Sequence, residues 1–166
     1  KGAGSTPATV QLEKAGVEFH VYEYEHSNDH MDDGYGVEAA TKLGFDEHQV
    51  FKTLMADTGA ERVVGVVPVS GHMDLKAGAA VGAKKASMAD PKVAMRESGY
   101  VVGGISPLAE DTHKTVLDES ALQFDQILVS GGKRGNVGMG TAVACVMVVM
   151  MLVVIIPYVS FTAKEK

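Results

Sequence analysis

Residues 51–69 read FKTLMADTGAERVVGVVPV, and this stretch decides the fold. Two mainly apolar runs, 51–56 and 62–69, are separated by the polar, glycine-containing connection Asp57-Thr58-Gly59-Ala60. Apolar runs of this length on either side of a short turn are typical of a β-hairpin. The sequence therefore predicts two antiparallel strands here, and the other elements are expected to assemble around them.

Helices and further strands are predicted on both sides of the hairpin. Pro7 follows Thr6 and Pro91 follows Asp90, so each proline stands where a helix commonly begins. The predicted helices are one from Pro7 that Gly16 ends, 37–43 closed by Gly44, a turn at 46–50, one from Asp74 through Val81, and one from Asp90 to about Glu97. The predicted strands are 17–22, 101–106, 116–117 and 126–129, with a loop at 27–36 and a short helical turn at 119–123. This order has no regular strand–helix–strand repeat, which favours a mixed α/β domain over a doubly wound sheet.

Length and composition agree with one domain. The chain has 166 residues, of which 46% are apolar and 22% charged, as is typical of a globular protein with one core. We expect a single domain over 6–166, with 1–5 a cloning remnant or a frayed end. The single cysteine excludes an intrachain disulfide framework, and the absence of tryptophan argues against an aromatic platform for single-stranded nucleic acid.

Charge is distributed unevenly along the chain. The formal net charge is −6, which divides into −8 for residues 1–61 and +2 for residues 62–166. A polyanion is therefore not attracted by the molecule as a whole. A nucleic-acid partner would have to meet a local basic patch or be delivered by another protein.

The last part of the chain has an unusual composition. Residues 135–163 contain no charged side chain, and 141–156 form an uncharged, almost wholly apolar run of sixteen residues. A helix that spans a bilayer needs about 20 such residues. We therefore expect residues 136–163 to form buried secondary structure. A membrane tail anchor and an error in the recorded residues are the alternatives.

Two groups of reactive side chains are weak candidates for a site. The loop at 26–33 contains the metal-ligand types His26, Asp29, His30, Asp32 and Asp33. Their spacing matches no established metal site, and acids on a loop are usually solvated. Cys145 lies inside the apolar run without a nearby histidine, an environment that keeps a thiol inert, so core packing is its expected role.

Three other features have the residue types of a binding or catalytic site. Lys52 interrupts an apolar strand, where it either extends outward to solvent or stands in a cleft as a working cation. The loop Gly103-Gly104-Ile105-Ser106-Pro107 is either a plain turn or a means of aiming backbone N–H groups at a carbonyl oxygen. Residues 129–135, VSGGKRG, end a strand with glycine-rich backbone and two cations, which suits a phosphate or a carboxylate.

Eight short motifs occur together in the order and at the spacing of one family. They are Thr6-Pro7-Ala8, Tyr24-Glu25-His26, Phe51-Lys52-Thr53-Leu54, Leu75-Lys76, Met88-Ala89-Asp90-Pro91, Gly99-Tyr100, Val102-Gly103-Gly104-Ile105-Ser106-Pro107 and Val129-Ser130-Gly131-Gly132-Lys133-Arg134-Gly135. Over about residues 6–135 the chain resembles the bacterial YbaK proteins, the Cys-tRNA(Pro) deacylases related to the editing domain inserted in prolyl-tRNA synthetases.

This resemblance implies a trans-editing enzyme that clears cysteine from mischarged tRNA(Pro). The implied fold is a single compact mixed α/β domain around a twisted, barrel-like, mostly antiparallel sheet. The resemblance makes Lys52 the essential side chain and 103–107 the active-site loop. The implied catalytic residues are Lys52, Gly103, Gly104 and Ser106, and those beside the substrate are Tyr24, Tyr100, Pro107, Ser130, Lys133 and Arg134.

The mechanism that the resemblance implies is substrate-assisted. The thiol of the misattached cysteine attacks its own ester carbonyl and leaves as a thiolactone, so the protein needs no nucleophile of its own. No cofactor and no metal are implied. The implied partners are the aminoacyl-tRNA and, for delivery, prolyl-tRNA synthetase; the expected location is the cytoplasm, without membrane attachment.

The chain departs from the family pattern after Gly135, and other functions stay open. Members of the family continue with a strand and a charged amphipathic helix, whereas this chain continues without charge, and Asn136-Val137 stand where a pocket acid is expected. Sister editing of Ala-, Ser- or Pro-tRNA is one alternative, because a pocket discriminates a methylene only by about 10–200-fold. A non-catalytic module that binds a small ligand or nucleotide through Lys52 and Lys133-Arg134 is the other.

Overall fold

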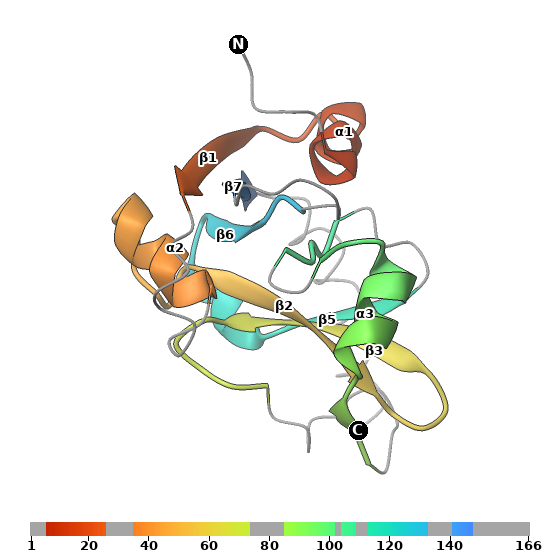
Figure 1. Ribbon diagram of the computed structural model, residues 1–166. Helices are drawn as coiled ribbons and strands as arrows, with labels where there is room; N and C mark the ends of the chain where they lie inside the picture. Colours follow the sequence, from red (N-terminus) through yellow and green to blue (C-terminus); the bar gives the residue numbers. More distant parts are fainter. Residues whose placement is uncertain are drawn as a thin grey trace, which may run out of the picture.

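A computed structural model describes residues 6–25, 35–73, 85–101, 104–108, 113–132 and 141–147 of the chain (Figure 1). In chain order its elements are α1 (Pro7–Lys14), β1 (Phe19–Glu25), α2 (Tyr35–Leu43), β2 (Phe51–Asp57), β3 (Arg62–Pro68), β4 (Ser87–Met88), α3 (Pro91–Ser98), β5 (Lys114–Leu117), the 3-10 helix η2 (Glu119–Gln123), β6 (Ile127–Ser130) and β7 (Thr141–Met147). Helices and strands are interspersed along the chain. The predicted mixed α/β class is therefore confirmed.

The predicted hairpin is present as β2 and β3. The two strands pair antiparallel from Phe51 opposite Pro68 to Asp57 opposite Arg62. The connecting turn is closed by the backbone N–H of Thr58, which donates to the carbonyl of Glu61 at 2.9 Å. Strand β4 adds to β2 and β5 adds parallel to β3, which gives a sheet of order β4-β2-β3-β5.

A second sheet has the order β1-β7-β6, and both of its pairs are antiparallel. It meets the first sheet where Val50, just before β2, bridges in parallel to Leu128 of β6. The N–H of Leu128 donates there to the carbonyl of Gln49 at 3.0 Å. The strand pairs are thus mostly antiparallel, as expected, while closure into a barrel stays an expectation.

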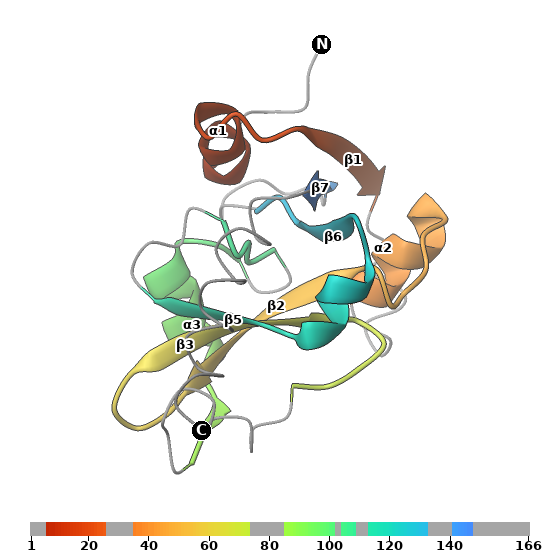
Figure 2. The same cartoon turned by 180° about the vertical axis from the view of Figure 1, so that it is seen from behind.

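The main hydrophobic core lies between the two sheets. Figures 1 and 2 show β1, β7 and β6 as a layer above β2, β3 and β5, with α2 toward one end and α1 and α3 toward the other. Both sheets, α1, η2 and the loop at 104–108 contribute to this core. Its buried members are Ala8, Leu12, Phe51, Val66, Leu108, Ala121, Ile127 and Val129. Side chains alternate between the two faces of a strand, so the neighbours Val50 and Leu128 belong to a separate cluster that includes Ala40 of α2.

Helix α1 begins as predicted, and its first residue also makes a distant contact. The hydroxyl of Thr6 accepts from the N–H of Thr9 at 3.2 Å, and the hydroxyl of Thr9 accepts from the N–H of Thr6 at 2.9 Å. This reciprocal cap satisfies donors that a helix start otherwise leaves unpaired. The Thr6 hydroxyl also donates to the carbonyl of Gly131 at 2.8 Å, which ties α1 to the end of β6.

Most of the other predicted elements are also found. Asp90 caps α3 through its carboxylate, which accepts from Lys92 N–H at 2.9 Å, and Gly99 ends the helix with φ of +72°. The β5–η2–β6 series matches the predicted strand, helical turn and strand. The predicted helical turn at 46–50 is a single hydrogen-bonded turn, with the N–H of Gln49 bonded to the carbonyl of Asp46 at 2.9 Å. The predicted helix at 74–81 and most of the loop at 27–36 lie outside the described residues.

The predicted strand at 101–106 is wrong. In its described part, Val101 and 104–106, the chain forms no strand, and the N–H of Gly104 bonds to the carbonyl of Val101 at 2.9 Å. Ile105 is 7% exposed and belongs to a buried cluster that includes Met55 and Tyr100. The apolar residues that suggested a strand therefore fill the core from a loop. Composition shows that such residues are buried, but it does not show whether their backbone pairs with a strand.

The first part of the uncharged tail is the central strand of its sheet. β7 has β1 on one edge and β6 on the other over Thr141–Met147. A strand paired on both edges has no use for charged side chains when its sheet is covered. The expected secondary structure is thus present over 141–147, while 148–163 lies outside the described residues. Within the described part of the chain, no helix has the length and apolarity to cross a membrane.

The double role of Thr6 predicts the stability of two variants. Thr6→Ala removes both the cap and the bond to Gly131, and we expect it to lower the free energy of unfolding by about 1–2 kcal/mol. Thr6→Ser keeps the hydroxyl and is expected to stay near the wild-type value. Chemical denaturation measures both. An equal loss in Thr6→Ser would assign the effect to the methyl group instead.

Candidate active site

Lys52 lies where strand β2 changes partners. On the edge away from β3, β2 meets β6 at its beginning, through Val50 and Leu128, and β4 at its end, through Ala56 and Met88. Among the strands that the structure describes, nothing pairs with this edge between those two contacts. An opening in the hydrogen-bonded network of strands thus coincides with Lys52, the one cation of β2.

Ser130 is brought level with Lys52 by the bridge between the sheets. In a parallel pair the two chains advance together, so two residues after Val50 and Leu128 stand Lys52 and Ser130. Because side chains alternate with period two, these residues share the face to which Val50 and Leu128 also belong. Both are half-buried. Two residues 78 positions apart in sequence are thereby neighbours on one surface.

Tyr24 belongs to the same surface. The register places Tyr22 of β1 and Ser130 of β6 on either side of Ala144 in β7, so Tyr22 and Ser130 point to one side of the sheet. Tyr24 follows two residues later on that side and is 8% exposed. We call the surface formed by Lys52, Ser130 and Tyr24 the Lys52 face.

The ammonium group of Lys52 is partly removed from water. Burial disfavours the charged form and lowers the pKa of Lys52 below its usual value. Within the described part of the chain no carboxylate forms an ion pair with it. The salt bridges found there involve other cations, such as Lys42 with Glu38 at 2.8 Å. A desolvated cation without a protein counter-charge is suited to an anionic or carbonyl ligand.

Tyr100 fastens the loop at 104–108 to the end of β6. Its ring is 2% exposed, and its hydroxyl donates to the carbonyl of Leu108 at 3.2 Å. The ring also contacts Gly132, whose φ of +84° and missing side chain leave room for it. Since Gly132 follows Ser130 by two residues, the loop is anchored close to the Lys52 face.

The described residues of the loop, 104–108, are all buried. Ser106 is fully buried, and its hydroxyl accepts from the N–H of Leu108 at 3.2 Å. The N–H of Gly104 is bonded to Val101 and so is occupied in a turn. Pro107 is buried within the same loop. In this conformation the N–H groups of Gly104 and Leu108 are engaged in hydrogen bonds within this part of the chain.

Several predicted residues fall outside the described part of the chain. They are Gly103, Lys133, Arg134 and the loop of possible metal ligands at 26–33. Within the described residues, no group of three potential metal ligands occurs. Cys145 stands in register with Val21 and Val129 rather than with Ser130. The bond from Thr6 to Gly131 was missed, because the Thr6-Pro7 motif signals only a helix start.

Comparison with known proteins relates this chain to a family of editing domains. The model of the aminoacyl-tRNA editing domain family matches residues 34–140. EbsC of Enterococcus faecalis, described as a candidate Cys-tRNA(Pro)/Cys-tRNA(Cys) deacylase, is 37% identical over 135 residues, which cover 78% of this chain and 79% of EbsC.

Solved structures show the same fold. A candidate trans-editing enzyme for prolyl-tRNA synthetase matches with a TM-score of 0.64 at 24% identity, over 86% of this chain and 87% of that one. The hypothetical protein APE2540 matches with a TM-score of 0.69 at 19% identity, over 84% and 87%. At these identities the likeness concerns the fold alone.

The contact between Tyr100 and Gly132 predicts a difference between two glycine substitutions. Gly16 and Gly132 both have positive φ, +66° and +84°, but a side chain at Gly16 would meet nothing within 4 Å. Gly16→Ala therefore reports the backbone strain alone, about 1–2 kcal/mol. We expect Gly132→Ala to lose at least about 1 kcal/mol more, because the methyl group displaces the Tyr100 ring. Equal losses in denaturant titrations would contradict this contact.

Proposed function

The chain belongs to the aminoacyl-tRNA editing domain family, and on that premise we propose that it deacylates tRNA(Pro) mischarged with cysteine. The proposal includes action in trans, in the cytoplasm, on a tRNA that another protein has charged. It also takes residues 6–166 as one editing domain. The observation that carries it is the Lys52 face, on which a desolvated cation stands level with Ser130 at the opening beside β2.

Lys52 is proposed to hold the ester end of the substrate. Its ammonium group has no ion-pair partner within the described residues, so the tRNA 3′ end or the ester carbonyl can take that place. Ser130 and Tyr24 provide a hydroxyl each on the same face. One donor aimed at the developing oxyanion contributes about 3 kcal/mol, or roughly 100-fold in rate.

The substrate is proposed to supply its own nucleophile. The cysteine sulfur attacks the ester carbonyl, a tetrahedral oxyanion forms, and the bond from carbon to the ribose oxygen breaks. The thiol proton ends on that ribose oxygen, so free tRNA and a thiolactone are the products. In this route the protein contributes position and electrostatics. Such a cyclisation releases the tRNA without water and is therefore classed apart from attack by water, which is a hydrolase reaction; on this route the enzyme would be grouped with the lyases.

Delivery by prolyl-tRNA synthetase is part of the proposal. A protein of net charge −6 attracts free tRNA weakly, so release of the mischarged tRNA close to the editing site would favour its capture. A deacylation panel of Cys-, Ala-, Ser- and Pro-tRNA(Pro) tests the choice of amino acid. Turnover of Ala- or Pro-tRNA(Pro) in preference to Cys-tRNA(Pro) would overturn the proposed substrate and favour a sister activity.

Lys52→Met is expected to lower the rate of Cys-tRNA(Pro) deacylation at least tenfold, or about 1.4 kcal/mol. It should not lower the melting temperature at neutral pH. Because the folded state lowers the pKa of Lys52, the charged group destabilises the fold there, and this penalty fades as the pH rises through the folded-state pKa. The matched control is Lys14→Met, an exposed lysine of α1. A retained rate would remove Lys52 from catalysis.

A blocked substrate thiol is expected to stop the reaction. S-methylcysteine esterified to tRNA(Pro) keeps the ester and the shape of the side chain but has no proton to lose and a much poorer nucleophile. We expect no turnover of this substrate, while it should still compete with Cys-tRNA(Pro) for the enzyme. Single-turnover assays measure both. Equal hydrolysis of the two esters would replace the substrate-assisted route by attack of water.

A further inference from the structure

The side chain of Met73 lies over Gly65 in β3. Gly65 has no Cβ, and a Cβ at this position would collide with the terminal methyl group of Met73 and lie 3.2 Å from its sulfur. Gly65 is buried, and Met73 is half-buried. The thioether therefore lies directly on the backbone of the sheet, a close approach that the missing side chain of glycine allows.

The register of the hairpin puts this contact on the Lys52 face. Gly65 stands opposite Leu54, and Val67 stands opposite Lys52. Residues two apart in a strand share a face, and so do residues paired across two strands. These four positions therefore face one side of the sheet. The diagonal from Lys52 to Gly65 spans about 7–8 Å, which is within reach of long side chains.

A turn after β3 carries the chain back to this position. The N–H of Gly71 donates to the carbonyl of Pro68 at 3.0 Å, so the chain turns directly after the strand. Met73 follows Gly71 by two residues and already reaches Gly65, which lies before Pro68 in the strand. The segment that carries Met73 therefore returns along β3, past the level of Val67 and Lys52.

Helix α2 covers the other end of the same face. The buried cluster at that end consists of Ala40, Val50, Val69 and Leu128. Val69 and Gly65 lie four residues apart, which is about 13 Å along an extended strand. Lys52 stands level with the middle of this interval. An amino acid whose ester is held at Lys52 is therefore bounded by α2 on one side and by Met73 on the other.

We propose that Met73, seated on Gly65, limits the size of the amino acid that is deacylated at Lys52. This inference rests on the proposed function and narrows its substrate class to esters whose side chain is no longer than that of cysteine. The thioether is apolar and polarisable, which suits contact with a small sulfur-bearing side chain. A longer side chain would have to displace the thioether from Gly65. In an apolar pocket one methylene group changes kcat/KM by about 10–200-fold.

The test compares two substrates that differ by one methylene group. Cys-tRNA(Pro) and homocysteinyl-tRNA(Pro) each have a thiol that can attack the ester carbonyl, after which a thiolactone leaves and the thiol proton ends on the ribose oxygen. Each rate is measured above the rate without enzyme. We expect Met73→Ala to raise the ratio of kcat/KM for homocysteine over cysteine at least about tenfold relative to wild type, because the shorter side chain leaves room for the methylene group. Since both substrates are tested on one variant, a loss of folded protein does not change this ratio.

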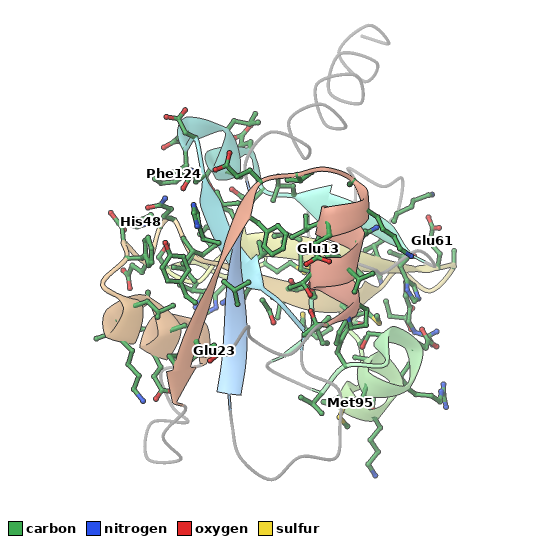
Figure 3. The ribbon with its side chains drawn as sticks, turned by 90° about the horizontal axis from the view of Figure 1, so that it is seen from above. Glu13, Glu23, His48, Glu61, Met95 and Phe124 are labelled. Carbon is green, nitrogen blue, oxygen red and sulfur yellow. The ribbon has the colours of Figure 1, made fainter. Side chains whose placement is uncertain are left out.

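Two controls isolate the size of the side chain at position 73. Met73→Leu nearly conserves the volume, so the ratio is expected to stay near the wild-type value. Met95→Ala shortens a methionine of α3 that is 37% exposed, and it should change neither rate. Ala94 of α3 shares a buried cluster with Met55, which lies on the face of β2 opposite Lys52. Figure 3 shows Met95 on this helix, on the side of the view opposite His48.

Gly65→Ala tests the contact itself. The added methyl group takes the place of the end of the Met73 side chain, which is flexible and can move, so we expect the protein to fold with Met73 displaced over the Lys52 face. This variant should lose at least about threefold in kcat/KM for Cys-tRNA(Pro), and Gly65→Ala/Met73→Ala should recover it, because substitutions at residues in contact are coupled.

The outcomes separate this inference from the proposed function. An unchanged ratio in Met73→Ala, or an equal shift in Met73→Leu, would overturn the role of Met73 while wild-type turnover of Cys-tRNA(Pro) still supports the proposed function. If the wild-type protein deacylates neither ester, the proposed function fails and this inference fails with it. That result is obtained without any variant, so the two failures are distinct.

Discussion

The parallel bridge between Val50 and Leu128 is the constraint on which the rest of the structure depends. The hydrogen bond from the N–H of Leu128 to the carbonyl of Gln49 joins two sheets that otherwise belong to distant parts of the sequence. It fixes which faces of β2 and β6 turn toward the main core. A slip of one residue would turn Lys52 into the core and Phe51 out of it. The Lys52 face therefore exists only in this register.

The segment after β6 is held from two further directions. The hydroxyl of Thr6 binds the carbonyl of Gly131, and the ring of Tyr100 packs on Gly132. One contact comes from the first helix and the other from the residue that follows the third helix. Glycine is needed at 132 because any side chain would occupy the place of the ring. The backbone beyond Ser130 is thus positioned by two segments that are distant from it in the sequence.

This construction suits a reaction in which the substrate brings its own nucleophile. Such a reaction requires the enzyme to orient an ester and to support developing negative charge. In the proposed function, the half-buried Lys52 does both without a neighbouring base.

The sequence by itself determined the local elements of this protein. The β2–β3 hairpin, the Thr6 and Asp90 caps and the β5–η2–β6 series follow from turn residues, capping residues and apolar patterns that lie within a few positions of each other. Lys52 was also identifiable, because a lone cation in an apolar strand is a local anomaly. Only the tertiary structure decided that Val101 and 104–106 form no strand, that Ser130 stands level with Lys52, and that Thr6 reaches Gly131 across 125 positions. The physical reason is that burial and register depend on which distant segments meet. The residue pattern of one segment does not say which other segment will pack or pair with it.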